Sequence, residues 1–465
     1  MQEFGIIGLG VMGKSLSRNM ARKGVGLSLY SRHATGEKSA ESFIAGYPEL
    51  SAAQGFHEIT SFVHSLQKPH KILLMVPAGE AVDEMLTQLL PQLTDGDVII
   101  DGGNSFYKDT NNRYKELLKA GVLYIGTGIS GGEAGALNGP SIMAGGAAEG
   151  YLVVKDLLEA IAAKDNAGGS CCAFTGKGGA GHFVKMIHNG IEYAEMQLVA
   201  ELYSILRFTG GYQPAEIAGL FKSLLTTSNS SYLLEITTEI LQQKENDQWL
   251  IDIILDKAGN KGTGGWTTAA GAELGVPVPT LTAALFARYQ SAFLGERKEA
   301  AALYNTRKTK TAVDANSLFI AFRLARIINH HQGFHLIDAA SELNEWNIDM
   351  AELARTWTNG CIIRSHLMNE LLPVLKEQKR ILQHPVIVQE IKAGIEFLNH
   401  TVAMAVTNNI PVPCLASAVQ YFHSYIQEQS NANIIQAQRD YFGAHTYERK
   451  DDPSGKKYHT QWTKE

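Results

Sequence analysis

The hydrophobic and polar positions follow two different patterns, one in each half of the chain. Up to about residue 178, short apolar runs alternate with stretches of helical periodicity, and most runs end in glycine or a small polar residue. Such continuous apolar runs are typical of strands buried on both faces of a parallel sheet. We therefore predict a sheet wrapped by helices, with strands at 4–10, 26–31, 71–76, 97–103, 123–130 and 141–146.

The second half has a helical pattern. From Gly178 to about residue 435, apolar residues recur at three- and four-residue spacing and β-type runs disappear, so we predict that this half is all helical. Pro277 and Pro411 occupy equivalent places in two similar Val-Pro segments, and Ala215 and Ala351 in a second pair of segments, 134 and 136 residues apart. This spacing favours an internal duplication. Chance similarity between two proline-rich helix starts is the alternative.

The residues after Ile435 form a third region. The end of this region is polar and typical of a flexible tail. Its beginning contains Arg439, Tyr441, Phe442 and His445, which favour a docking arm over a frayed terminus. The predicted organisation is an α/β Rossmann-type domain (1–178), a large all-α domain (179–435) and a C-terminal arm (436–465).

Composition narrows the class of protein. The chain has 465 residues, of which 45% are hydrophobic and 19% charged, and its formal net charge is -6. These values indicate a globular protein of more than one domain, with no general attraction for nucleic acid. No segment reaches the roughly 18 apolar residues that span a bilayer, and the first strand leaves no room for a signal peptide. With four cysteines that lack Cys-x-x-Cys spacing, we expect a cytoplasmic protein without a membrane partner.

No metal is expected. Histidines, cysteines and carboxylates nowhere have the spacing of zinc ligands. His330 and His331 are adjacent, so on a helix their side chains diverge by about 100° and cannot readily share an ion. We expect both at the surface.

A glycine-rich turn indicates a dinucleotide site. Gly8, Gly10 and Gly13 have GxGxxG spacing between a predicted strand and a helix, where the helix N-terminus favours a pyrophosphate. The next strand ends in Ser31-Arg32-His33 without a carboxylate. The Arg32 guanidinium suits the 2′-phosphate of NADP, although a solvated loop arginine is the alternative. The predicted cofactor-binding residues are Gly8, Leu9, Gly10, Val11, Met12, Gly13, Ser31, Arg32, His33, Val76, Pro77, Ala78 and Asn104.

Two further loops follow predicted strands at the same edge of the sheet. In the loop DGGNS, we expect Asp101 to hold its own turn rather than to catalyse, and Asn104 to lie near the nicotinamide. Ser130, Gly131 and Gly132 end another strand, and their backbone N–H groups would cradle a carboxylate. A plain connecting loop is the alternative.

The segment KMIHNGIEY, residues 185–193, places polar residues in a helical pattern. At about 3.6 residues per turn, Lys185, His188 or Asn189, and Glu192 share one face. An exposed polar face is the ordinary interpretation. However, Gly190 in a helix interior costs about 1 kcal/mol against alanine, which indicates that another constraint requires it.

Together these motifs resemble the 6-phosphogluconate dehydrogenase family, decarboxylating enzymes of the pentose phosphate pathway within the β-hydroxyacid dehydrogenases. The resemblance covers nearly the whole chain, through GLGVMG, DGGNS, GISGGEAGA, GHFVKMIHNGIEY, ILDKAGNKGTGGW, GCIIRS and QRDYFGAHTYE. It implies a homodimer that uses NADP to convert 6-phospho-D-gluconate to D-ribulose 5-phosphate and CO2.

The resemblance also implies roles for matching residues. Lys185 would be the general base on the 3-hydroxyl and Glu192 the acid that protonates the enediol. To act as a base, Lys185 must be neutral, which requires a depressed pKa. The implied substrate-binding residues are Asn104, Ser130, Gly131, Gly132, His188, Asn189, Tyr193, Lys261, Thr263, Arg288, Arg439 and His445. The last two would reach the phosphate site of the partner subunit.

Some positions depart from the family pattern. Ser31 and His33 replace an asparagine and a threonine beside Arg32, which leaves the choice between NADP and NAD open. Pro77 and Gly265 stand where the family has side chains that neither can replace.

Two alternatives for the function remain. A dehydrogenase for a small unphosphorylated substrate, such as 3-hydroxyisobutyrate, would give Lys261, Arg288, Arg439 and His445 no purpose. A catalytically silent NADP sensor predicts the loss of Lys185 or Glu192, and both are present.

Overall fold

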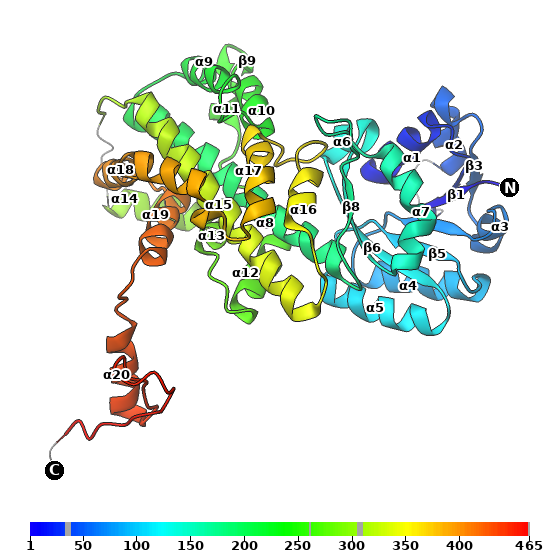
Figure 1. Ribbon diagram of the computed structural model, residues 1–465. Coiled ribbons are helices and arrows are strands. Elements are labelled where there is room, and N and C mark those ends of the chain that lie inside the picture. Colours follow the sequence, from blue (N-terminus) through cyan, green and yellow to red (C-terminus); the bar gives the residue numbers. More distant parts are fainter. Residues whose placement is uncertain (33–38, 260–261, 305–309, 464–465) are drawn as a thin grey trace. The chain divides into compact units, whose positions relative to one another are not determined.

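The computed structural model describes residues 1–32, 39–259, 262–304 and 310–463. The chain forms two compact units, Met1–Ala418 and Val419–Glu465. The first unit contains the sheet and most of the helices, and the second contains helix α20 (Figure 1).

Within the described residues, the sheet has eight strands in the order β3-β2-β1-β4-β5-β6-β7-β8. Its strands are β1 Phe4–Ile7, β2 Leu27–Tyr30, β3 Gln54–Phe56, β4 Lys71–Leu74, β5 Val98–Asp101, β6 Leu123–Ser130, β7 Ser141–Gly146 and β8 Cys172–Phe174. All six predicted strands are present, and the three-residue strands β3 and β8 were missed. Among these strands, β6 and β7 pair antiparallel, with Ser130 opposite Ser141, whereas the other pairs are parallel.

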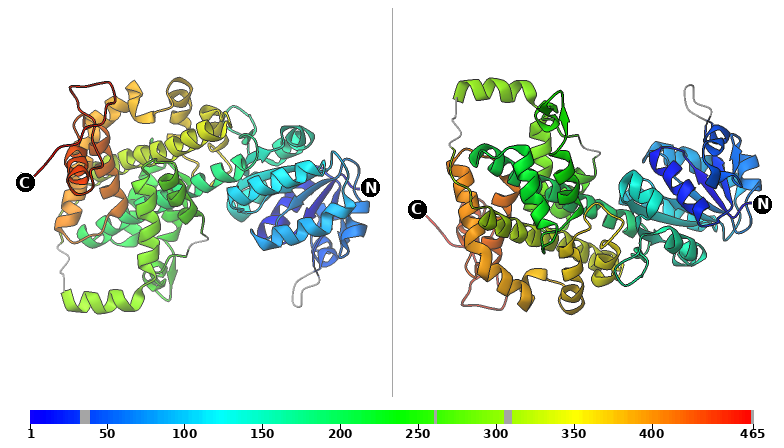
Figure 2. Two further views of the ribbon diagram at one scale, coloured as in Figure 1. Left: turned by 90° about the horizontal axis from the view of Figure 1, so that it is seen from below. Right: turned by 90° about the horizontal axis from the view of Figure 1, so that it is seen from above.

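Helices cover both faces of the sheet (Figure 2). Because side chains alternate along a strand, the neighbours Ile6 and Ile7 of β1 belong to opposite hydrophobic clusters. One cluster includes residues of α1 Val11–Arg22, α2 Ala40–Ala45, α6 Gly132–Asn138 and α7 Ala148–Ile161. The other includes residues of α3 Ile59–His64, α4 Glu80–Leu89 and α5 Tyr107–Lys119. This two-sided burial explains the continuous apolar runs in the sequence.

Among the residues that the structure describes, the second half is helical, as predicted, apart from the two-residue strands β9 Lys244–Glu245 and β10 Gln248–Trp249, which pair with each other. Its helices in the first unit begin with α8 Ala180–Ser204, which continues as a π-helical turn, Ile205–Thr209. The others are α9 Pro214–Leu224, α10 Tyr232–Ile240, α11 Leu250–Ile253, α12 Thr263–Glu273, α13 Pro279–Ser291, α14 Leu294–Tyr304, α15 Ala315–Asn344, α16 Met350–Thr356, α17 His366–Glu377, α18 Pro385–Thr407 and α19 Pro413–Tyr425, whose last residues belong to the second unit.

The order of these helices supports the predicted internal duplication. Helices α8, α9, α10 and α13 begin at residues 180, 214, 232 and 279, and α15, α16, α17 and α19 begin 134 to 136 residues later. Ser231 and Ser365, the N-caps of α10 and α17, form an antiparallel bridge with each other. The two repeats therefore meet at equivalent positions.

The prediction that His330 and His331 lie at the surface is wrong. Both belong to α15 and are buried, with exposed fractions of 0% and 1%. Adjacent side chains do diverge on a helix, but α15 packs against α8, α13 and α18 and is covered on several sides.

The second unit has more structure near the end of the chain than the flexible tail predicted there. It contains the end of α19, helix α20 Ala432–Gly443 and a bridge between Tyr447 and Tyr458. The N–H of each of these tyrosines donates to the carbonyl of the other over 2.8 Å.

Candidate active site

A cavity of about 1240 Å³ lies at the carboxyl ends of β1, β2, β4 and β5. This is where the strand order reverses, the usual ligand position in a doubly wound sheet. Its lining includes every predicted cofactor residue that the structure describes: Gly8, Leu9, Gly10, Val11, Met12, Gly13, Ser31, Arg32, Val76, Pro77, Ala78 and Asn104. His33 lies outside the described residues.

The glycine turn brings backbone close to this cavity. A Cβ on Gly13 would lie 2.0 Å from the Gly8 carbonyl oxygen, so only glycine permits this approach of α1 to β1. Gly10 is the N-cap of α1 and has no side chain with which to cap it. The first N–H groups of α1 therefore face the cavity at the positive end of the helix, as an anion requires.

Arg32 lies at the end of β2 with an exposed side chain. Its Nη1 is 3.9 Å from Glu84 Oε2, and both side chains are 63% exposed. Surface ion pairs of this kind contribute little free energy, so a phosphate could displace Glu84 at low cost.

Asp101 holds its own turn, as the sequence favoured. Its buried carboxylate accepts hydrogen bonds from Gly103 N at 3.0 Å, Ser105 Oγ at 2.6 Å and Tyr124 Oη at 2.9 Å. These bonds shape the loop that presents the exposed Asn104 to the cavity.

Sequence reasoning missed an aromatic part of the cavity wall. Trp266 of α12 lines the cavity together with Phe106, and their ring centroids are 4.9 Å apart. In the sequence, Trp266 directly follows the KGTGG segment. This position was the signal that could have identified Trp266 as part of the site. This contact brings the helical half of the unit to the cofactor cavity.

In the polar strip of α8, Lys185 and His188 are buried, and the strip is internally hydrogen-bonded. Lys185, 7% exposed, donates from Nζ to Asn189 Oδ1 over 2.7 Å, and its Nζ lies 3.3 Å from His188 Nδ1. On the other side of the ring, His188 Nε2 is 3.2 Å from Ser130 Oγ, at the end of β6. The helix therefore meets the predicted carboxylate loop, Ser130 to Gly132, through His188.

The rest of the predicted strip lies beside these residues. The Glu192 carboxylate is 3.7 Å from His188 Nδ1, and Asn189 Nδ2 donates to Thr263 Oγ1 over 3.4 Å. The Arg288 guanidinium stacks 3.5 Å above the Tyr193 ring. Lys261 lies outside the described residues, and Arg439 and His445 belong to the second unit.

Gly190 is required by packing. A Cβ at this position would lie 2.6 Å from Thr267 Cγ2 of α12. Thr267 also donates from Oγ1 to the Met186 carbonyl over 2.9 Å. Glycine therefore allows α12 to approach α8 closely, which brings Thr263 and Trp266 to the site.

Burial sets the electrostatics of the strip. It lowers the pKa of Lys185 below its usual value, although the charge of Glu192 opposes this effect. Burial, together with the charge of Lys185, holds the pKa of His188 well below its usual range. A neutral imidazole and an easily deprotonated amine are thus held together.

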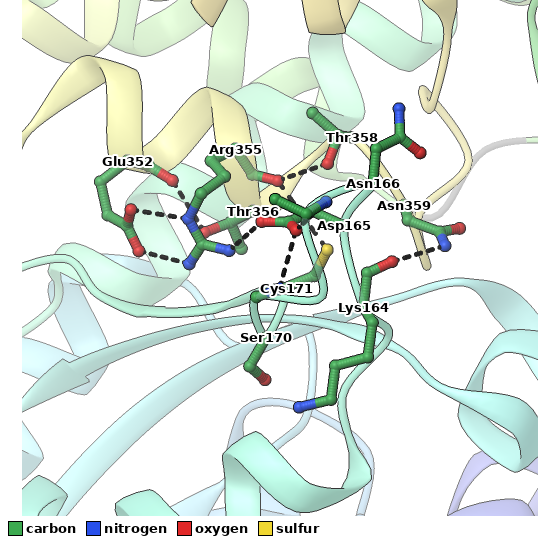
Figure 3. A network of polar contacts seen from close by, with 12 residues as sticks. Lys164, Asp165, Asn166, Ser170, Cys171, Glu352, Arg355, Thr356, Thr358 and Asn359 are labelled. Carbon is green, nitrogen blue, oxygen red and sulfur yellow. Dashed lines mark hydrogen bonds and ion pairs between the residues drawn. The ribbon is translucent and has the colours of Figure 1, made fainter.

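A polar network supports the site from the side of α16 (Figure 3). Arg355 donates from Nη1 to Asp165 Oδ2 over 2.8 Å, and Asn359 donates from Nδ2 to the Lys164 carbonyl over 2.9 Å. Between these two anchors lies Trp357, which is wholly buried and packs edge-on against the His188 ring at 5.4 Å. The sequence had given no sign of this contact.

Within the described ranges, no three histidine, cysteine or acidic side chains gather as metal ligands. No helix among these residues is long and apolar enough to cross a membrane.

Comparison with known proteins defines the family. Residues 3–176 match the NAD binding domain of 6-phosphogluconate dehydrogenase, and residues 181–462 match the 6-phosphogluconate dehydrogenase C-terminal domain. The chain belongs to the 6-phosphogluconate dehydrogenase family. A relative in Staphylococcus aureus (strain N315), 6-phosphogluconate dehydrogenase, decarboxylating, is 42% identical over the full length of both chains. A Haemophilus ducreyi relative with the same name is 42% identical over 99% of this chain and 96% of its own.

A solved structure in this family has the same fold. Plasmodium falciparum 6-phosphogluconate dehydrogenase, studied as the apo form and with NADP+ and 6-phosphogluconate, superimposes with a TM-score of 0.94. It is 36% identical, and the match covers 99% of this chain and 100% of that one. The predicted family and fold class are thus confirmed.

Proposed function

We propose that this protein oxidises and decarboxylates 6-phospho-D-gluconate to D-ribulose 5-phosphate and CO2 while reducing NADP to NADPH. The observation that carries the proposal is the cluster of the buried Lys185 and His188 with the half-buried Asn189, beside Ser130, in the unit that holds the cofactor cavity. Full-length relatives named for this activity support it. A silent NADP sensor would not need a buried lysine beside a neutral histidine.

The residues of the cavity fit NADP. The bare N-terminus of α1 suits the pyrophosphate, and the exposed Arg32 suits the 2′-phosphate. When bound, NADP accepts a hydride from carbon 3 of the substrate. Asn104 and the backbone of 76–78 lie in the same cavity and are assigned to cofactor binding.

Lys185 is proposed as the general base. In its neutral form, the amine removes the proton of the 3-hydroxyl as the alcohol is oxidised. The resulting ammonium then donates a hydrogen bond to the new carbonyl oxygen, which takes up negative charge as CO2 leaves. Glu192 is proposed to protonate carbon 1 of the enediol afterwards.

The remaining residues hold the two ends of the substrate. Ser130, Gly131 and Gly132 are assigned to the carboxylate end, where His188 and Asn189 also contact the substrate. Tyr193, Thr263 and Arg288, with Lys261, are assigned to the phosphate. We infer that Arg439 and His445 complete this phosphate site from the arm of a second copy of the chain.

We assign one function to each of the three successive regions of the chain. Residues 1–178 bind NADP, 179–435 bind substrate and form the dimer, and 436–465 reach the partner. The break between the two family matches, from 176 to 181, supports the first boundary. A reducing, cytoplasmic location is supported by the four cysteines, which are all free and buried.

Substrate choice tests this proposal. With NADP present, the purified protein should turn over 6-phosphogluconate and should be nearly inactive on gluconate and on 3-hydroxyisobutyrate. Preference for 3-hydroxyisobutyrate would instead support the small-substrate alternative.

A further inference from the structure

In the second unit, one carboxylate organises the fold. Asp440 of α20 is wholly buried, whereas its neighbours Tyr441 and Phe442 are 60% and 71% exposed. So small a unit cannot bury much apolar surface, so its conformation depends on polar contacts. A buried carboxylate in such a unit needs several hydrogen bonds.

Asp440 accepts four hydrogen bonds from separate parts of the arm. Oδ1 accepts from Thr446 N at 2.9 Å and from His459 Nδ1 at 2.9 Å. Oδ2 accepts from Thr460 N at 3.1 Å and from Trp462 Nε1 at 2.8 Å. The carboxylate thereby ties α20 to the turn that follows it and to the last described segment of the chain.

The turn held in this way is a strained one. Ala444 and Thr446 have φ angles of 47° and 61°, in the left-handed region that residues with a side chain rarely adopt. This conformation is unfavourable for both residues, so the turn persists because other contacts fix it. The bond from Thr446 N to Asp440 is one such contact, and the bond from Gln436 Nε2 to the Thr446 carbonyl, 2.6 Å long, is another.

We call Asp440 and its four hydrogen-bond donors the clamp. Arg439 adjoins Asp440 in the chain, and His445 adjoins Thr446, which is one of the donors. Arg439 precedes Asp440 and donates from Nη1 to Gln436 Oε1 over 3.0 Å. His445 lies between the two strained residues, and its ring packs edge-on against Phe442 at 5.8 Å. The position of His445 thus depends on this turn, and the Arg439 side chain is linked to the turn through Gln436.

The clamp stays ionised over a wide pH range. Burial alone would raise the pKa of Asp440, but the hydrogen bonds from His459, Thr460, Trp462 and Thr446 lower it to about 2. The donors of the arm therefore satisfy the negative charge of Asp440. The carboxylate does not compete with a bound anion for Arg439 or His445.

We propose that Asp440 is the positioning residue of the arm: it fixes the turn after α20 so that Arg439 and His445 bind a phosphate monoester as one pair. The inference rests on the proposed function, in which these two residues bind the phosphate of the substrate. Asp440 itself does not touch the substrate.

Asp440→Asn in the full-length protein tests the inference, because the amide keeps the size but cannot accept from both sets of donors. The KM for 6-phosphogluconate should rise about ten-fold, the equivalent of one well-made hydrogen bond, while the KM for NADP changes by less than about two-fold. The matched control is Asp451→Asn, an exposed carboxylate of the same unit that pairs with Arg449, and it should leave both constants unchanged.

A double-mutant comparison separates positioning from general damage. In a protein that already carries Arg439→Ala and His445→Ala, adding Asp440→Asn should not raise the KM further. If the Asn variant does not fold, Trp462→Phe removes one donor to the clamp and should raise the same KM by a smaller factor.

The outcomes distinguish the positioning role of Asp440 from the phosphate-binding role of Arg439 and His445. If Arg439→Ala raises the KM for 6-phosphogluconate but the Asp440 and Trp462 variants do not, the positioning role is overturned and the phosphate-binding arm stands. A further rise in the triple variant also overturns it, because Asp440 would then act independently of the pair. If the Arg439 and His445 variants leave the KM unchanged, the proposed phosphate site itself is wrong.

Discussion

Lys185 Nζ and Asn189 Oδ1 are joined by a 2.7 Å hydrogen bond across one turn of α8. The bond directs one N–H of the buried amine along the helix, while His188 stands 3.3 Å away on the same side. Because the amine is buried, it carries its positive charge at a cost and gives up its proton more readily than an exposed lysine. This relationship is the physical basis of the proposed base.

Replacing Lys185 by methionine should abolish turnover. Loss of a general base lowers kcat by about 10³-fold, and methionine preserves most of the buried apolar length. NADP binding, measured by calorimetry, should remain, because Lys185 is outside the cofactor cavity lining. Lys177→Met is the control. Lys177 lies shortly before the start of α8, is exposed and pairs with Glu345. Near-normal activity of Lys185→Met would exclude Lys185 as the base.

The pH profile should show the depressed pKa of Lys185. Burial lowers this pKa, so the neutral amine is present at lower pH than for an exposed lysine. The kcat/KM for 6-phosphogluconate should therefore fall as the pH drops through this lowered pKa, because the base becomes protonated. If the residual activity of Lys185→Met retains the same acidic limb, the limb belongs to another group.

Replacing Arg32 by alanine should change the choice of cofactor. Loss of a charge-assisted contact to the 2′-phosphate should raise the KM for NADP at least about ten-fold and leave that for NAD nearly unchanged. Arg22→Ala serves as the control, since Arg22 is a partly exposed arginine at the end of α1 that pairs with Glu49. Equal effects on the two cofactors would mean that Arg32 does not recognise the 2′-phosphate.

Glu201 should make the stability of the protein depend on pH. It is buried on α8 and accepts hydrogen bonds from Cys414 N and Leu415 N at 2.9 Å each, and burial raises its pKa from 4.5 to about 7. A raised pKa means that the folded state binds the proton more tightly than the unfolded state. The stabilisation is thus complete below pH 4.5 and is lost as the pH rises through 7, by about 3 kcal/mol in total.

Denaturant unfolding at several pH values measures this effect. Glu201→Gln should remove most of the decline in unfolding free energy between pH 5 and pH 7, because an amide does not ionise. Glu235→Gln, at an exposed position on α10, should leave the decline intact. An unchanged decline in the Glu201 variant would contradict the assignment.

Local sequence patterns predicted strands and helices well where consecutive residues are all buried or where a motif marks the start of a helix. The run 97–103 predicted β5, and GLGVMG predicted the turn and the start of α1, because these features depend on neighbouring residues. The strand Gln54–Phe56 was missed, since it is three residues long and only partly buried at the edge of the sheet.

Contacts between distant segments could not be predicted in this way. Gly190 was recognised as unusual, but its reason is the approach of Thr267, a residue on another helix. His330 and His331 were misplaced because the pattern of one helix does not show how many neighbours cover it. Trp357 reaches His188 only because Arg355 and Asn359 anchor its loop to the sheet half of the unit.

The proposed function is oxidation coupled to decarboxylation at one site. Its most direct test is to incubate the purified protein with 6-phosphogluconate and NADP, and to record NADPH absorbance and CO2 release in the same sample. If the proposed function is right, both products form in equal amounts, and both are lost in Lys185→Met. NADPH formation without CO2, or no turnover of 6-phosphogluconate with either NADP or NAD, would contradict it.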